Sequence, residues 1–92
     1  MTDQEISYIE EQILNKRVKF VKVEDCRFNG SHPNRVNNGH TEVGVCRQVF
    51  PYVYIDGGNM WFHSSAVFGV SQVSDSRFEV RTRNSVYQLD LL

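Results

Sequence analysis

The chain has 92 residues and a net charge of −1, because ten Lys and Arg nearly balance eleven Asp and Glu. This length predicts a single domain, residues 1–92, and the near-neutral charge disfavours a general nucleic-acid coat, which is usually strongly basic. Hydrophobic residues at 40% and aromatic residues at 12% suffice for a packed core, so an intrinsically disordered chain is excluded.

The sequence also bears on the cellular compartment. It contains no apolar run of about 18 residues, which a membrane-spanning helix requires. The first residues are polar and acidic, so no signal peptide is predicted. Two cysteines without an export signal favour reduced thiols in a cytoplasmic protein.

Residues 3–14 are predicted to form a helix. Thr2 and Glu5 have the spacing of a capping box, in which the Thr hydroxyl accepts a hydrogen bond from the Glu amide. One helical stripe then collects the apolar residues Ile6, Ile9, Ile13 and Leu14. Asn15 is expected to end the helix, which is short enough to need docking on other elements.

The next part of the chain predicts two strands and a long loop. Alternating valines, Phe20 and lysines place the first strand at residues 17–25, and a second strand is expected over residues 43–49, before Pro51. Residues 27–43 are rich in Asn and Gly and predict one long loop.

A tight hairpin is predicted in the middle of the chain. Residues 52–55 and 60–63 are its strands, and the Gly-rich segment 56–59 is its turn. Residues 63–66 are expected to form a short helical turn, and residues 67–73 another strand.

The final hairpin shows the clearest alternation of apolar and polar residues. A turn at Arg83-Asn84 pairs Val80 with Tyr87, whereas a turn at Asn84-Ser85 shifts the register by two, and the sequence does not choose between them. Together the elements predict an α+β fold that is mainly β. An N-terminal helix is expected to close one end or cover a face of a small, strongly bent antiparallel barrel over residues 17–91.

Four residues of metal-ligating type lie in or beside the predicted loop: Cys26, His32, His40 and Cys46. Cys and His are zinc ligands, and two of each form a known tetrahedral set. The closely spaced cysteine pair typical of structural zinc sites is missing, so we expect these four side chains to bind no metal. A Cys26–Cys46 disulfide is a further alternative and requires an oxidising compartment.

Catalytic motifs are not evident. A Cys–His nucleophile needs a thiolate beside a base and a third orienting group, and no local signature supports such a set. The glycines do not have the spacing of a phosphate-binding loop. We therefore expect neither an enzyme nor a cofactor.

Aromatic residues crowd the centre of the chain: Phe50, Tyr52, Tyr54, Trp61, Phe62 and Phe68. Strand alternation places Tyr52 and Tyr54 on one face and the residues between and after them on the other. One face cannot bury all six rings, so part of the aromatic surface is expected to be exposed. Tyr, Trp and Arg dominate protein interfaces, and seven of the ten basic residues are Arg.

Charge is segregated along the chain. Residues 1–14 contain four acids and no base, whereas residues 15–27 contain five bases and two acids. A basic, aromatic face is typical of single-stranded nucleic-acid binding, and its residues would be Lys16, Arg17, Lys19, Lys22, Arg81 and Arg83. The acidic helix is alternatively expected to meet a basic site on a protein, or to mimic nucleic acid.

Two stretches resemble known proteins. Trp61-Phe62-His63-Ser64-Ser65-Ala66-Val67 resembles the strand, short helical turn and strand of small SH3-like barrels. Thr82-Arg83-Asn84-Ser85-Val86-Tyr87 resembles a T-x-N-S-x-Y ending in accessory proteins of large tailed bacteriophages. The resemblance covers about a third of the chain. It implies an early, non-virion phage protein that modifies or blocks a host protein, often by stoichiometric binding.

The leading hypothesis is a non-enzymatic protein-binding module, a phage-encoded inhibitor or regulator of a host protein in defence or nucleic-acid machinery. Its contacts are expected from Tyr52, Tyr54 and Trp61, from Phe28 and Arg35 in the long loop, and from Glu10 and Glu11 on the helix. The first alternative is nucleic-acid binding. The second is a sponge for a nucleotide signal, held between protomers of a homo-oligomer.

Overall fold

The computed structural model describes residues 2–25 and 39–92. Within this part of the chain one helix precedes seven strands that form a single antiparallel sheet, so the prediction of a mainly β fold is confirmed. The elements are α1 (Asp3–Ile13), β1 (Arg17–Asp25), β2 (Thr41–Gln48), β3 (Tyr54–Asp56), β4 (Trp61–His63), β5 (Val67–Gln72), β6 (Arg77–Thr82) and β7 (Ser85–Leu91).

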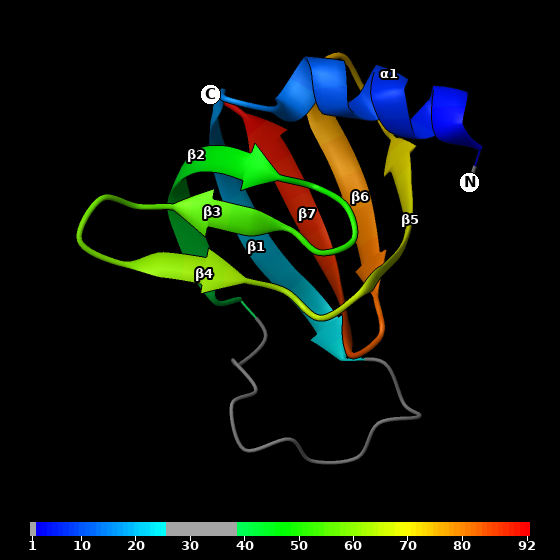
Figure 1. The fold of residues 1–92 in the computed structure, drawn as a ribbon. Helices are drawn as coiled ribbons and strands as arrows, with labels where there is room; N and C mark the ends of the chain where they lie inside the picture. Colours follow the sequence, from blue (N-terminus) through cyan, green and yellow to red (C-terminus); the bar gives the residue numbers. More distant parts are fainter. Residues whose placement is uncertain (1, 26–38) are drawn as a thin grey trace.

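The sheet is strongly curled (Figure 1). Its strand order is β4-β3-β2-β1-β7-β6-β5, yet the two end strands, β4 and β5, are joined by residues 64–66 alone. Rings from distant strands therefore meet inside the curl. Phe62 of β4 lies 5.7 Å from Phe20 of β1 and 6.1 Å from Tyr87 of β7, measured between ring centroids.

The link between β4 and β5 is a bend, so the prediction of a helical turn at residues 63–66 is wrong. Ser64 is bonded to Val53 twice: its amide donates to the Val53 carbonyl at 2.9 Å, and its hydroxyl accepts from the Val53 amide at 3.0 Å. The Ser65 hydroxyl donates to Thr82 Oγ1 at 2.9 Å. These hydrogen bonds satisfy polar groups at residues 64 and 65 without the hydrogen bonds of a helix.

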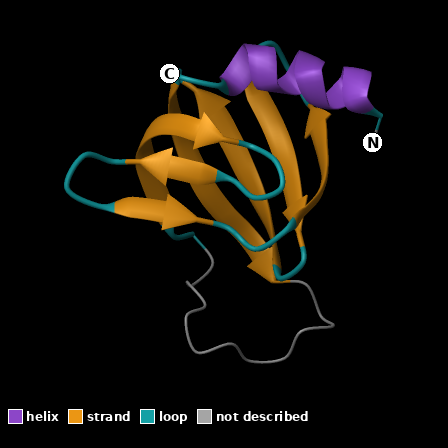
Figure 2. Cartoon of the chain, in the orientation of Figure 1, coloured by secondary structure: helices purple, strands orange, loops and turns teal. Residues whose placement is uncertain are grey.

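Helix α1 lies across one end of the curled sheet (Figure 2). The Thr2 hydroxyl accepts from the Glu5 amide at 3.2 Å, as the capping box predicts. The helix ends one residue earlier than expected, and Asn15 follows with a φ of 64°. Ile9 and Ile13 are buried in the core, whereas Tyr8 is 57% exposed.

The core lies on the inner face of the sheet, beneath α1. Its buried members are Ile9, Ile13, Val18, Phe20, Cys46, Val49, Val53, Ile55, Val70, Phe78, Val80, Tyr87 and Leu89. Phe20 and Tyr87 are stacked, with centroids 4.4 Å apart. Val53 and Ile55 are buried while Tyr52 is exposed and Tyr54 half-buried, which confirms the expected alternation.

Strand pairing settles the bounds that the sequence left open. Val80 pairs with Tyr87, so the last turn is at Arg83-Asn84. Strand β2 begins at Thr41, because pairing with β1 extends back to Gly39, whose amide donates to the Lys22 carbonyl at 2.7 Å. The predicted loop over residues 27–43 is therefore too long at its end, and its residues 27–38 lie outside the described residues.

Candidate functional site

The outer face of the sheet points away from the core, and its side chains form rows across the strands. One row follows directly from the strand registers: Arg17 pairs with Val45, Val45 with Asp56, and Asp56 with Trp61. The row begins with a basic side chain on β1 and ends with an indole on the edge strand β4. Trp61 is 61% exposed.

Four aromatic rings pack side by side at the β4 end of this face: Tyr52, Tyr54, Trp61 and His63, which we call the aromatic strip. The rings of Tyr54 and Trp61 are parallel to within 3°, with centroids 5.8 Å apart. Those of Trp61 and His63 lie 5.2 Å apart at 17°, and those of His63 and Tyr52 5.5 Å apart at 58°. The strip is thus one continuous chain of contacts on exposed surface.

The local sequence explains why these rings point outward. Val53, Ile55 and Phe62 occupy the inner side of the β3–β4 hairpin, so the alternating positions face solvent. The turn is made by Gly58, with a φ of 92°, whose amide donates to Asp56 Oδ1 at 2.9 Å. Gly44 lets β3 approach β2 closely, since a Cβ there would lie 2.3 Å from the Asp56 carbonyl oxygen.

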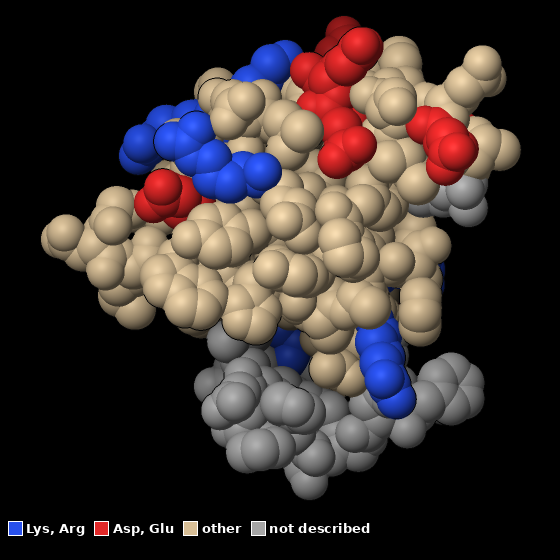
Figure 3. All heavy atoms as spheres, viewed as in Figure 1, with Lys and Arg blue, Asp and Glu red and all other residues tan. Residues whose placement is uncertain are grey.

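Charged groups border the strip on the β2 side. Arg47 Nη1 donates to Asn15 Oδ1 at 3.0 Å, and its Nε lies 3.8 Å from Asp56 Oδ2. Both side chains of the ion pair are partly exposed, so the pair contributes little to stability. Figure 3 shows a broad uncharged surface in the centre of this view, with basic and acidic groups gathered above it and further basic groups below it.

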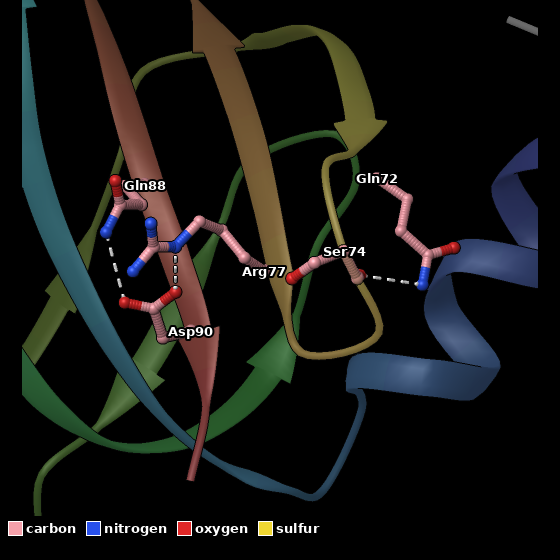
Figure 4. Close-up of polar contacts among 5 residues, drawn as sticks. All are labelled: Gln72, Ser74, Arg77, Gln88 and Asp90. Atoms are coloured by element: carbon pink, nitrogen blue, oxygen red, sulfur yellow. Dashed lines mark hydrogen bonds and ion pairs between the residues drawn. The ribbon is translucent and has the colours of Figure 1, made fainter.

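The outer face of β1, β7 and β6 has a different character, because its charges are paired across strands. Lys19 pairs with Asp90 and Asp90 with Arg77 in the strand registers. Arg77 Nε donates to Asp90 Oδ1 at 2.8 Å, and Gln88 Nε2 donates to Oδ2 at 3.1 Å (Figure 4). Desolvation alone would raise the pKa of Asp90, but these hydrogen bonds and the charges of Arg77 and Lys19 outweigh it and lower the pKa.

The structure changes the set of residues predicted for nucleic-acid binding. Lys16, Arg17, Lys19, Arg81 and Arg83 are exposed, whereas Lys22 is only 1% exposed, so its assignment to a binding face is wrong. Lys22 lies on the same side of β1 as the buried Val18 and Phe20, and alternation turns it inward. Arg81 is paired with Glu79 at 3.0 Å.

The structure separates the two described members of the zinc set. His40 and Cys46 are six residues apart along extended chain, which places their Cα atoms roughly 15–20 Å apart. A tetrahedral zinc ion lies within about 2.3 Å of each of its ligand atoms, so these two side chains cannot bind the same ion. Cys26 and His32 lie outside the described residues.

Each described zinc candidate has another partner. His40 Nε2 lies 2.6 Å from Glu42 Oε1. The Cys46 thiol is fully buried and donates to the Gln48 carbonyl at 3.2 Å. Burial raises the pKa of Cys46 and the hydrogen bond to Gln48 lowers it by a smaller amount, so the pKa is about 11. The thiol is therefore neutral near pH 7.

The remaining predicted contacts fall in two places. Glu10 is half-buried and Glu11 exposed, both on α1 rather than on the β3–β4 hairpin. Phe28 and Arg35 lie outside the described residues. His63 was not predicted as a contact, although its position two residues after Trp61 on a strand places both side chains on the same face.

Comparison with models of protein families, with curated proteins and with solved structures finds no match to the chain. In the part of the chain that the structure describes, no helix is both long and apolar enough to cross a membrane. No group of three or more His, Cys, Asp or Glu side chains is arranged to hold a metal ion among those same residues.

Proposed function

We propose that the protein is a non-enzymatic binding module that contacts a partner protein through the aromatic strip. The observation behind the proposal is the chain of four mutually packed rings on exposed surface. Trp and Tyr are the residues most enriched in energetic hot spots of protein interfaces. Contiguous exposed apolar surface, unlike single scattered apolar residues, marks interaction sites.

Packing among the rings supports binding in a second way. Trp61 is flanked by nearly parallel rings of Tyr54 and His63, so its rotamer is held before any partner arrives. Ordering a free side chain on association costs about 0.5–1.5 kcal/mol, and a held ring avoids most of that cost. Rigid aromatic anchors are what efficient interfaces use.

The charges near the strip favour a protein over a nucleic acid. The carboxylate of Asp56 stands in the row between Arg17 and Trp61, where it would repel a phosphate backbone. Arg47 is engaged with Asp56 and Asn15. A mixed polar rim around an aromatic centre is the usual make-up of a protein interface.

The class of partner that we propose rests on the sequence resemblance. In the stretch that resembles SH3-like barrels, the two strands β4 and β5 support that class, whereas the link between them is a bend and not the expected helical turn. Under this proposal the protein is phage-encoded, acts in the cytoplasm of an infected bacterium, and inhibits or regulates a host protein.

A capture experiment with matched variants tests this function. Tagged wild type, Trp61→Ala and Phe68→Ala proteins are used as baits in a bacterial lysate, because Phe68 is an equally exposed ring, at 70%, on the opposite edge strand. We expect the same stoichiometric protein on wild type and Phe68→Ala, and at least about tenfold less on Trp61→Ala.

Three outcomes would overturn the proposal. The first is equal capture by Trp61→Ala and wild type. The second is capture that nuclease removes, which would favour the nucleic-acid alternative. The third is loss on Phe68→Ala only, which would move the contact to β5.

A further inference from the structure

A second candidate surface lies on the opposite side of the molecule from β4, where α1 passes over β5. A groove of about 320 Å³ runs there between Gln4, Glu5, Tyr8 and Ile9 of α1 and Val70 and Gln72 of β5; we call it the α1–β5 groove. Its floor is apolar, because Ile9 and Val70 are core residues that are 6% and 8% exposed. Tyr8 at its rim is more than half exposed.

The β5 side of the groove is an open sheet edge. The Val73 amide donates to the Arg77 carbonyl at 2.8 Å, which identifies a hydrogen-bonded pair of the β5–β6 ladder. In an antiparallel ladder such pairs alternate, so the backbone N–H and C=O groups of Val70 and Gln72 point away from β6. These groups have no backbone partner in the described part of the chain, and their two residues line the groove.

Strand β5 lacks most of the features that usually block an edge, and its one register shift against β6 lies between Val67 and Gly69, before the groove. Its six residues include no charged side chain and no proline, whereas the opposite edge strand, β4, has only three residues. In Figure 1 the N-terminal turns of α1 extend past the outer side of β5. A strand added beside β5 would therefore lie beneath the helix and cover the apolar floor of the groove.

The charge of the surrounding helix defines the occupant. Glu5 lines the groove, and Asp3 and Glu11 line an adjoining hollow along the same helix, which has no basic residue. An added segment with Lys or Arg would meet these carboxylates. A second copy of the chain would offer its own β5, which contains no basic residue and so fits less well.

We propose that the open edge of β5 beneath α1 accepts an extended segment of a partner protein that has apolar residues at alternate positions and Lys or Arg at the end that passes α1. The segment adds an eighth strand to the sheet through the backbone groups of Val70 and Gln72. Its apolar side chains cover Ile9 and Val70, and its basic side chains face the acidic helix. Main-chain bonds supply affinity in this mode, and the groove supplies selectivity. The surface is distinct from the aromatic strip and is independent of it.

Two substitutions at one position isolate the backbone contact. Gln72→Pro removes an N–H that the β5–β6 ladder does not use, a position where edge strands tolerate proline. Gln72→Ala keeps that N–H and removes only the side chain, whose amide donates to the Ser74 carbonyl at 3.1 Å (Figure 4). A difference between the two variants therefore reports the backbone bond.

The test selects binders from a displayed library of random peptides of about nine residues, using the full-length wild-type chain. We expect enriched peptides to have apolar residues at alternate positions and Lys or Arg toward one end. They should bind Gln72→Pro at least about tenfold more weakly than Gln72→Ala, and Glu5→Gln about threefold more weakly than wild type at low salt. Trp61→Ala should bind them normally, which separates this result from the proposed function.

Amide hydrogen exchange supplies a readout that does not depend on a folded proline variant. In the free protein the amides of Val70 and Gln72 should exchange faster than that of Val73, and a bound peptide should slow them. The proposal is overturned if no peptide is enriched, if acidic peptides are, or if Gln72→Pro and Gln72→Ala bind equally. A wild-type dimer that Gln72→Pro dissociates would assign the edge to a second copy and also overturn it.

Discussion

The close approach of β2 and β3 at Gly44 gives the most exact prediction, for the substitution Gly44→Ala. A Cβ at this position would lie 2.3 Å from the carbonyl oxygen and 2.7 Å from the carbonyl carbon of Asp56. Favourable contacts between such atoms begin at about 3.5 Å, so the two backbones would have to separate by roughly 1 Å. Because the obstacle is backbone, no side-chain rotation can relieve it.

The expected cost is about 2–3 kcal/mol, at the upper end of what overpacking a folded interior costs. A small domain has only about 5–15 kcal/mol of stability, so this change should lower Tm by roughly 10–20 °C. Urea denaturation measures it, followed by circular dichroism and by the fluorescence of Trp61, the one tryptophan of the chain.

Gly69→Ala is the matched control. A Cβ at Gly69 meets nothing within 4 Å and Gly69 does not have a positive φ, so we expect a change within about 0.5 kcal/mol. Equal stabilities of Gly44→Ala and Gly69→Ala would refute the proposed reason for glycine at position 44.

Three further outcomes follow from buried and paired groups. In a Cys26→Ser background, Cys46 should react with thiol reagents only after unfolding. Folding raises the pKa of this thiol from 9.0 to about 11, so the unfolded chain releases the proton at lower pH than the folded chain. The free energy of unfolding should therefore fall by about 2–3 kcal/mol between pH 9 and 11, and Cys46→Ala should remove this pH dependence. Arg77→Ala should raise the pKa of Asp90 in an NMR titration and cost at most about 1 kcal/mol at neutral pH, and this cost should vanish as pH falls through the lowered pKa of Asp90. Phe62→Ala should cost about 2–3 kcal/mol in urea denaturation, because its ring packs inside the curled sheet; a cost below about 1 kcal/mol would contradict that placement.

Local signals in the sequence were sufficient for much of the fold. The Thr2–Glu5 spacing located the start of α1, and the apolar run over residues 17–25 gave both ends of β1 correctly. Both features depend on residues close together in the chain. The helical turn expected at residues 63–66 does not form, because hydrogen bonds between Ser64 and Val53 fix the conformation of that segment.

The register of the last hairpin and the orientation of Lys22 needed tertiary information. Both candidate turns kept the same side chains inward. The Thr82 hydroxyl accepts from the Ser85 amide at 3.1 Å, which closes the turn at Arg83-Asn84. Lys22 follows Phe20 on the inner side of β1, where the charge of the residue alone argues for solvent.

The candidate site was only partly visible in the sequence. Strand alternation identified Tyr52 and Tyr54 as neighbours, and the abundance of aromatic residues drew attention to Trp61. The packing of His63 into the same strip requires the β3–β4 register. The α1–β5 groove joins residues more than 60 positions apart, so no local pattern could reveal it.

The central claim is that the aromatic strip binds a protein partner, and its most direct test is a titration. Dissociation constants are measured between the captured partner, once purified, and wild type, Trp61→Ala and Phe68→Ala proteins of confirmed fold. We expect Kd to rise at least about tenfold for Trp61→Ala, which is about 1.4 kcal/mol, and less than about twofold for Phe68→Ala. A Kd for Trp61→Ala within about twofold of wild type would contradict the claim.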